Sequence, residues 1–173
     1  MKTTFALLAI LVSTSFAQQT KNPVTSVLRD SLVGRAKNTV AAFVAMPADK
    51  YDFKPTPEQM TFGHLAAHIV ESNYFFCANA GDVPAPKVDE LKGTEGKDKL
   101  VAAMQASFDF CGTALAKADD SKLGDTIVGF DGRPHPRAWA FLASASSWSD
   151  HYGAAAMYLR LNGILPPTAQ PKK

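Results

Sequence analysis

The segment TFGHLAAHIVESNYFFCANAG, residues 61–81, decides the fold because it contains a helix start, a helical stripe and a helix end. Thr61 is a residue type favoured at helix N-caps, and Gly81 is one that commonly stops a helix. Between them, one stripe recurs every three or four residues and consists of Leu65, His68, Ile69, Ser72 and Phe76. This spacing predicts a helix that begins at Thr61, reaches about residue 80 and buries one face.

Three further segments show the same periodicity, and they cover residues 23–45, about 96–118 and about 134–162. Pro47 ends the first of them, because the residue before a proline is disfavoured in the helical conformation. Gly163 ends the last, where it is expected as the residue just past the helix. The connections 82–95 and 119–133 contain prolines or glycines, and no strand-like alternation is sustained anywhere. The sequence therefore predicts an all-α protein of four helices.

The chain opens with MKTTFALLAILVSTSFA, residues 1–17, which has the features of a secretory signal peptide. Lys2 supplies the basic start, residues 5–12 form the apolar core, and Ser15 and Ala17 are the small residues before a cleavage site. We expect cleavage after Ala17, which leaves residues 18–173 as a single domain that is periplasmic or secreted. The apolar core is too short to cross a bilayer about 30 Å thick, so the protein is not expected to be membrane-embedded.

The formal net charge of +2 is small, and the lysines are scattered along the chain except for Lys172 and Lys173 at its end. Proteins that bind nucleic acids instead concentrate basic residues on one face or along one helix. The composition therefore excludes a nucleic acid as the expected partner.

Four segments together resemble the DinB-like family of bacterial proteins. They are MPADKYDFKPTPEQMTFGHLAAHI at 46–69, NYFFC at 73–77, SFDFC at 107–111 and HYGAAAMYLRLNGILPP at 151–167. The resemblance covers roughly residues 22–167, and the last segment is its most specific part. It implies a four-helix bundle whose helices run up-down-down-up, with a long crossover between the second and third helices. It also implies a homodimer as a candidate assembly, although no stripe can be assigned to an interface.

The two cysteines, Cys77 and Cys111, are expected to form a disulfide if the protein is exported and has this topology. Cys77 lies 16 residues past Thr61, and Cys111 lies 15 residues past Gly96. In two parallel helices that start together, these positions differ in height by only about 2 Å. The alternative is that both cysteines are small, buried, apolar residues.

A histidine site is the chemical feature that the resemblance implies. Metal-bearing members of the family carry one histidine on the second helix and an HxxxH pair on the fourth. His68 corresponds to the first of these, and His151 corresponds to the second histidine of the pair. Ser147 stands where the pair has its other histidine. The resemblance therefore implies a divalent metal, namely zinc, nickel or manganese, at a site that lacks one ligand.

Two nearby side chains are candidates to complete this site. His64 lies one helical turn before His68, on the same face, and is the candidate third ligand. Glu71 lies three residues after His68 and is suited to ligate the metal or to orient an imidazole. The other interpretation is a polar pocket lined by His68, Ser147 and His151 that no longer holds a metal.

Two functions follow from these alternatives, and the sequence leaves open whether the protein is an enzyme. The first is a metal-dependent hydrolase or transferase, in which the metal would activate water or a thiolate. The second is a non-catalytic binding or scaffold module of the cell envelope, with a small molecule as its partner or none. If His64 points towards His68 and His151, the enzyme is favoured, whereas an exposed His64 favours the binding module.

Overall fold

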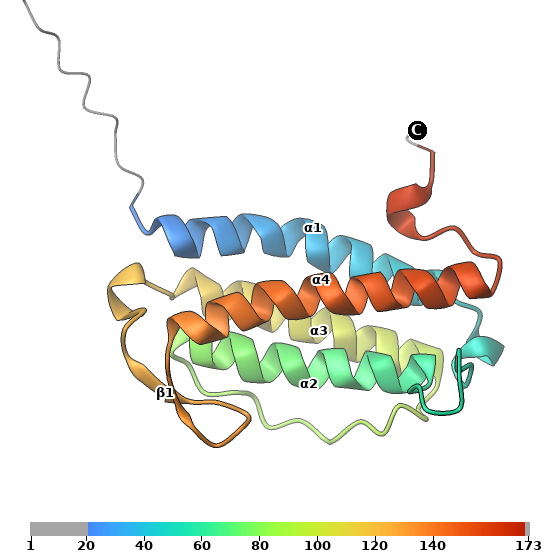
Figure 1. The fold of residues 1–173 in the computed structure, drawn as a ribbon, viewed down its shortest axis with the longest axis horizontal. Coiled ribbons are helices and arrows are strands. Elements are labelled where there is room, and N and C mark those ends of the chain that lie inside the picture. The colour runs from blue at the N-terminus through green and yellow to red at the C-terminus, as the bar shows by residue number, and fades with distance from the viewer. Residues whose placement is uncertain (1–20, 172–173) are drawn as a thin grey trace, which may run out of the picture.

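The computed structural model of the protein describes residues 21–171, and its main elements are four long α-helices (Figure 1). They are α1 (Pro23–Ala45), α2 (Phe62–Gly81), α3 (Lys97–Ala116) and α4 (Ala138–Leu161). Three short 3-10 helices lie at Ala48–Lys50, Asp120–Lys122 and Pro167–Ala169, and two short strands, β1 (Thr126–Val128) and β2 (Pro134–Pro136), form a hairpin. The prediction of an all-α fold with four helices is confirmed.

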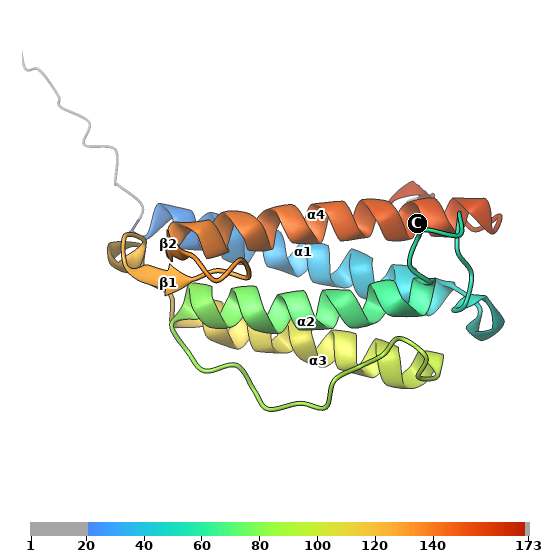
Figure 2. The same cartoon turned by 60° about the horizontal axis from the view of Figure 1, so that its bottom comes forward.

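The helices form a bundle in which α1 and α4 run in one direction and α2 and α3 in the other (Figures 1 and 2). Each helix packs against two neighbours, since the main contacts join α2 to α3, α2 to α4, α1 to α4 and α1 to α3. The segment between α2 and α3, residues 82–96, returns along the outside of the bundle and is called the crossover loop below (Figure 2). The predicted up-down-down-up topology is therefore confirmed.

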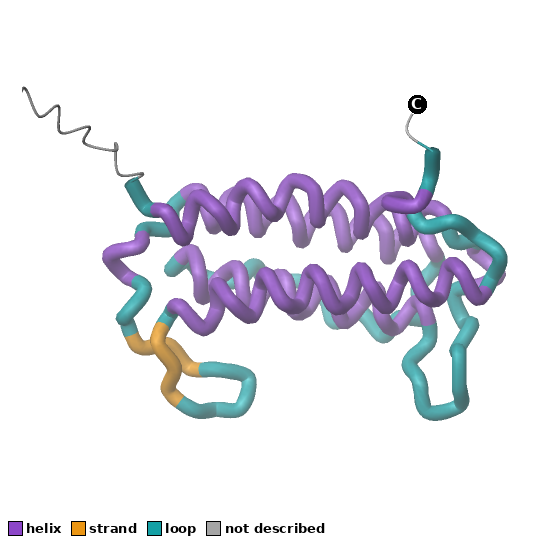
Figure 3. Tube along the Cα trace, turned by 45° about the horizontal axis from the view of Figure 1, so that its top comes forward, coloured by secondary structure: helices purple, strands orange, loops and turns teal. Residues whose placement is uncertain are grey.

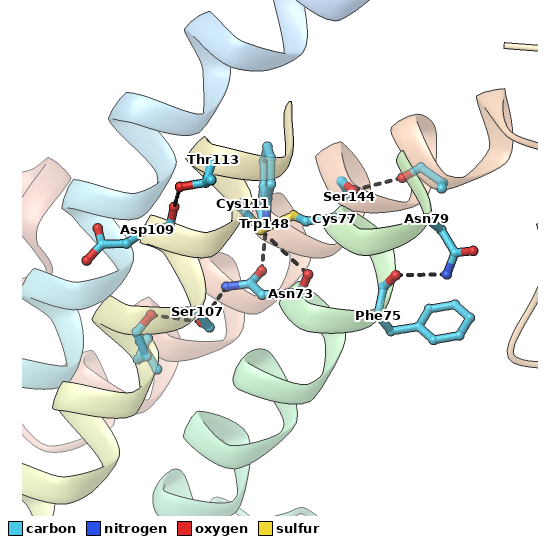
Figure 4. The surroundings of a disulfide bond; sticks show 12 residues. Asn73, Phe75, Cys77, Asn79, Ser107, Asp109, Cys111, Thr113, Ser144 and Trp148 are labelled. Atoms are coloured by element: carbon cyan, nitrogen blue, oxygen red, sulfur yellow. Dashed lines mark hydrogen bonds between the residues drawn. A yellow bond between two sulfur atoms is a disulfide. The ribbon is translucent and has the colours of Figure 1, made fainter. Parts of the chain in front are cut away.

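The parallel packing of α2 and α3 brings Cys77 and Cys111 together in a disulfide, with a Cα–Cα distance of 5.1 Å (Figure 4). Beside it, the buried Asn73 amide donates to the Ser107 hydroxyl and accepts from the Trp148 indole N–H, at 2.9 and 2.8 Å. These two bonds tie α2 to both α3 and α4 through side chains that are removed from water. The predicted pairing of the two cysteines is thus present in the fold.

One local prediction is wrong, and one helix boundary is set by a strand pairing that the periodicity does not show. Gly81 does not stop α2, because Asp82 takes the left-handed conformation at φ 54° and ends the helix instead. Gly81 is needed for packing, since a Cβ atom there would lie 2.5 Å from the carbonyl oxygen of Ala114 on α3. The fourth helix, predicted to start near residues 134–137, begins at Ala138 with Arg137 as its N-cap, because residues 134–136 pair with β1 in the hairpin, which Figure 3 shows as orange segments.

The core lies between the four helices and is filled by large apolar side chains. Fully buried examples are Phe43, Phe62, Ile69, Leu100, Met104, Leu115 and Leu159. Among the residues that the structure describes, no helix is both long enough and apolar enough to cross a membrane. The predicted signal peptide and its cleavage site lie outside the described residues.

Candidate functional site

His68 on α2 and His151 on α4 lie next to each other, because these two helices are packed side by side. Their ring centroids are 4.9 Å apart and the rings are nearly perpendicular, at 84°. Both side chains are half-buried. The fold therefore brings together two residues that are 83 positions apart in the sequence, and it places the edge of one imidazole against the face of the other.

Ser147 supports this pair from the turn of α4 that precedes His151. Its hydroxyl oxygen lies 3.0 Å from Nδ1 of His151, a hydrogen-bond distance. Burial lowers the pKa of His151, and the neighbouring His68 lowers it further, while Asp150 and a hydrogen bond with the backbone of Ser147 act in the opposite direction. The net effect lowers the pKa of His151 and so favours its neutral imidazole form. When Ser147 donates to Nδ1, the ring proton of His151 resides on Nε2.

The structure places both candidate ligands from the rest of α2 at exposed positions. His64 is exposed, and its backbone N–H donates to the Thr61 hydroxyl at the start of the helix. Glu71 is exposed as well. Within residues 21–171, no group of three histidine, cysteine, aspartate or glutamate side chains is placed to hold a metal ion. The donors at the paired histidines are therefore two imidazoles and one serine hydroxyl.

A cavity of about 410 Å³ lies between α2 and the crossover loop, and we call it the crossover cavity. Three of the sequence-predicted residues line it, namely His64, His68 and Glu71, whereas Ser147 and His151 are not among its lining residues. The remaining lining residues are Ala67, Val70, Tyr74 and Phe75 of α2, together with Ala85, Val88, Asp89, Glu90 and Leu91 of the crossover loop. The pair of histidines therefore adjoins the cavity through His68.

The crossover loop is fixed at its first residue by a charged cluster that the sequence analysis did not identify. Arg137, whose side chain is only 8% exposed, contacts Asp82 at 2.9 Å, and Lys122 contacts the same carboxylate at 2.7 Å. The hydrogen bond from Lys122, and then the charge of Arg137, lower the pKa of Asp82. Arg137 also donates to the backbone oxygen of Asn79. These contacts anchor the loop to the hairpin end of the bundle.

The far end of the crossover loop is fixed by close backbone packing. Gly93 has φ 79°, and a Cβ atom at this position would lie 2.4 Å from Cα of His64. Gly63, on the α2 side of this contact, is equally crowded, because a Cβ atom there would lie 2.2 Å from the backbone oxygen of Gly93. Both ends of the loop are therefore held against the bundle, and the cavity lies between them.

Comparisons with known proteins agree with this architecture. The sequence model of the DinB superfamily matches residues 32–154, which is more than half of the chain. The chain is similar in structure to a DinB-like protein from Bacillus subtilis, with 18% sequence identity and a TM-score of 0.66, over 84% of this chain and 99% of the other. It is also similar to a DinB-like protein from Bacillus cereus ATCC 10987, with 17% identity and a TM-score of 0.67, over 82% and 95%. No curated protein matches the chain.

Proposed function

The chain belongs to the DinB superfamily, and on this premise we propose that it is an exported, non-catalytic binding module that holds a small molecule in the crossover cavity. The proposal is carried by where the predicted site residues lie relative to the cavity. His64, His68 and Glu71 line a cavity, whereas the metal-site positions His151 and Ser147 lie outside its lining. An exposed His64 is the arrangement that favours a binding module over an enzyme.

The donor set at the paired histidines does not fit the metal centre of a hydrolase or transferase. Structural zinc sites use four protein ligands, and catalytic ones use three together with a water molecule. Here two imidazoles are present, and the third position is a serine hydroxyl that is hydrogen-bonded to His151. A neutral hydroxyl is a poor ligand for zinc or nickel, which prefer imidazole nitrogen or thiolate sulfur. No metal-dependent step is therefore assigned to these residues.

The histidines instead have a role in shaping the cavity wall. Ser147 fixes the orientation of the His151 ring, and His151 in turn packs against the His68 ring at 4.9 Å between centroids. His68 lines the cavity, where its imidazole nitrogens can hydrogen-bond to a bound molecule. The cavity volume of about 410 Å³ lies within the range of about 300–1,000 Å³ that is typical of small-molecule sites.

Two features support export, namely the disulfide and the N-terminal sequence. The Cys77–Cys111 disulfide is buried, and disulfides persist in oxidising compartments rather than in the cytosol. The N-terminal sequence has the features of a signal peptide. Intact-mass analysis of protein recovered from a bacterial periplasm should give a chain that begins at Gln18 with both cysteines oxidised. A chain recovered only in the cytosol with its N-terminus intact would contradict export.

The absence of a resident metal is tested by elemental mass spectrometry on untagged protein exported to a periplasm. We expect far less than one equivalent of zinc, nickel or manganese, both in the wild type and after His151→Ala substitution. Near-stoichiometric metal in the wild type that is lost in His151→Ala would refute the binding module and favour a metal-dependent hydrolase.

Binding in the cavity is tested with 2-phenylethanol as a neutral probe, by its effects on the amide NMR spectrum. We expect the shifted amides to lie on α2 and the crossover loop, with Ala67→Phe weakening binding because the new ring fills the cavity. Leu142→Trp, at a position 72% exposed on α4, adds an aromatic ring elsewhere and serves as the matched control. Shifts that are spread over the surface, or are equally strong in Ala67→Phe, would contradict the proposal.

A further inference from the structure

We propose that the crossover cavity selects organic cations, that is, molecules with a protonated or quaternary amine attached to an apolar or aromatic body. This inference rests on the proposed binding function and names its ligand class. It is carried by three properties of the cavity lining. Apolar residues and two aromatic rings form much of it, three carboxylates from α2 and the crossover loop form what we call the acidic rim, and no lysine or arginine is present.

The apolar part of the cavity lining suits the apolar body of such a ligand. Apolar side chains line the cavity from both walls, namely Ala67 and Val70 of α2 and Ala85, Val88 and Leu91 of the crossover loop. The two aromatic residues are each held by a second ring: Tyr74 lies against Phe110 with centroids 5.4 Å apart, and Phe75 stacks on Phe130 at 3.7 Å. Aromatic side chains in a lining can attract cations through the negative charge of the π system.

The rim of the cavity is negatively charged. Glu71 of α2 and the loop residues Asp89 and Glu90 all line it, and no lysine or arginine does. None of these three carboxylates takes part in the ion pairs found in the described part of the chain. Lys87 and Lys92 flank the acidic pair in sequence but do not line the cavity. Apart from the histidines His64 and His68, the ionisable carboxylates and bases of the lining are therefore all acidic, and they come from both α2 and the crossover loop.

Two other hollows on the surface lack this imbalance. The one between α2 and the hairpin is lined by Asp82 and Arg137, which pair with each other. The groove between α1 and α3 is lined by one basic residue, Lys37, and one acidic residue, Asp109. Each of these hollows thus contains one charge of each sign, so neither attracts a cation as the crossover cavity does. A cation in the crossover cavity would meet carboxylates from α2 and from the crossover loop, together with the aromatic residues Tyr74 and Phe75 of the lining.

The proposal is tested with three probes of nearly equal shape and different charge: 2-phenylethylammonium, 2-phenylethanol and 3-phenylpropanoate. Each is titrated into protein comprising residues 18–173 at neutral pH, and the Kd is read from amide chemical shifts. We expect the ammonium probe to bind about tenfold more tightly than the alcohol, and the carboxylate probe to bind most weakly. Raising the ionic strength from about 0.02 M to about 0.3 M should reduce the preference, because salt screens exposed charges.

Charge-removing variants of unchanged shape locate the effect. Glu71→Gln and Glu90→Gln should each weaken the ammonium probe about threefold, as expected for exposed carboxylates, and leave the alcohol unchanged. Glu58→Gln removes the same charge from an exposed position outside the cavity lining and is the control. The preference for cations is overturned if the ammonium and alcohol probes bind equally, or if Glu58→Gln has the same effect as Glu71→Gln.

The two proposals fail in different ways. If the alcohol shifts amides around the cavity and Ala67→Phe abolishes this, but the ammonium probe has no advantage, the binding module stands and the cation preference is wrong. If none of the three probes shifts the amides around the cavity, both are wrong.

Discussion

Reduction of the Cys77–Cys111 disulfide is the perturbation that tests the packing of the bundle most directly. The bond joins α2 to α3 across the crossover loop, and both cysteines are fully buried. Reduction removes the covalent link but leaves both sulfur atoms in the core. The change in stability therefore reports the link itself and not a lost side chain.

The magnitude follows from the length of chain that the bond closes. The two residues are 34 positions apart. In the chain-entropy description, a closed loop of this length lowers the entropy of the unfolded chain by an amount worth about 4 kcal/mol at 25 °C. With a urea m-value of about 2 kcal/mol per molar for a small domain, the unfolding midpoint should fall by about 2 M.

The assay is urea unfolding followed by far-UV circular dichroism, on oxidised protein and on the same protein reduced by a phosphine. The double variant Cys77→Ala with Cys111→Ala should unfold at lower urea still, because it also loses two buried sulfur atoms. If oxidised and reduced protein unfold at the same midpoint, the parallel α2–α3 arrangement that brings the cysteines together would be refuted as the folded state in solution.

Two further predictions concern the crossover loop and the histidine pair. Gly93→Ala should destabilise the protein by about 2 kcal/mol or more, because it combines a positive φ with a Cβ placed 2.4 Å from Cα of His64. Gly132→Ala has a similar φ of 72° but open space around it, so it should cost less, and equal losses in urea unfolding would contradict the role of the close contact. NMR titration should place the pKa of His151 below the ordinary value of 6.5, with His68→Gln raising it. Since the unfolded chain then binds this proton more readily, the His151 contribution should make the free energy of unfolding fall as the pH drops below about 6.5, and a pKa above 6.5 would refute the argument.

The sequence predicted the helices well because their signals are local. The predicted first helix, residues 23–45, has the observed bounds, and the N-cap at Thr61 is confirmed by the hydrogen bond that its hydroxyl accepts from the His64 N–H. Gly163 has the positive φ expected just past α4. Caps, proline stops and apolar stripes depend only on neighbouring residues, so they can be interpreted without knowing the fold.

The details that the local pattern did not predict concern contacts between distant residues. Residues 134–136 belong to a strand only because β1 lies opposite them, with Ile127 facing His135 in the register. The role of Gly81 depends on the backbone of Ala114, a residue on another helix. Neither partner can be identified from the periodicity of one segment, because nothing in a local pattern specifies which distant residue it will meet.

One part of the candidate site was predicted from the sequence and another part was not. The proximity of His68 and His151 was implied by the family resemblance and is present in the structure. The acidic rim was not predicted, because the position of Asp89 and Glu90 depends on the path of a loop without regular structure. That path is set by the contacts at its two ends, above all the burial of Arg137 against Asp82.

The links that hold the bundle together do not involve Ser147 or the paired histidines. The bundle is cross-linked by a disulfide and by the buried hydrogen bonds of Asn73, which together join α2 to α3 and α4. A half-buried imidazole still needs a polar partner, since an unpaired polar group away from water is costly. Ser147 supplies that partner to His151 at 3.0 Å. The hydrogen bond between Ser147 and His151 therefore leaves the His151 ring partnered beside His68, and His68 in turn lines the crossover cavity.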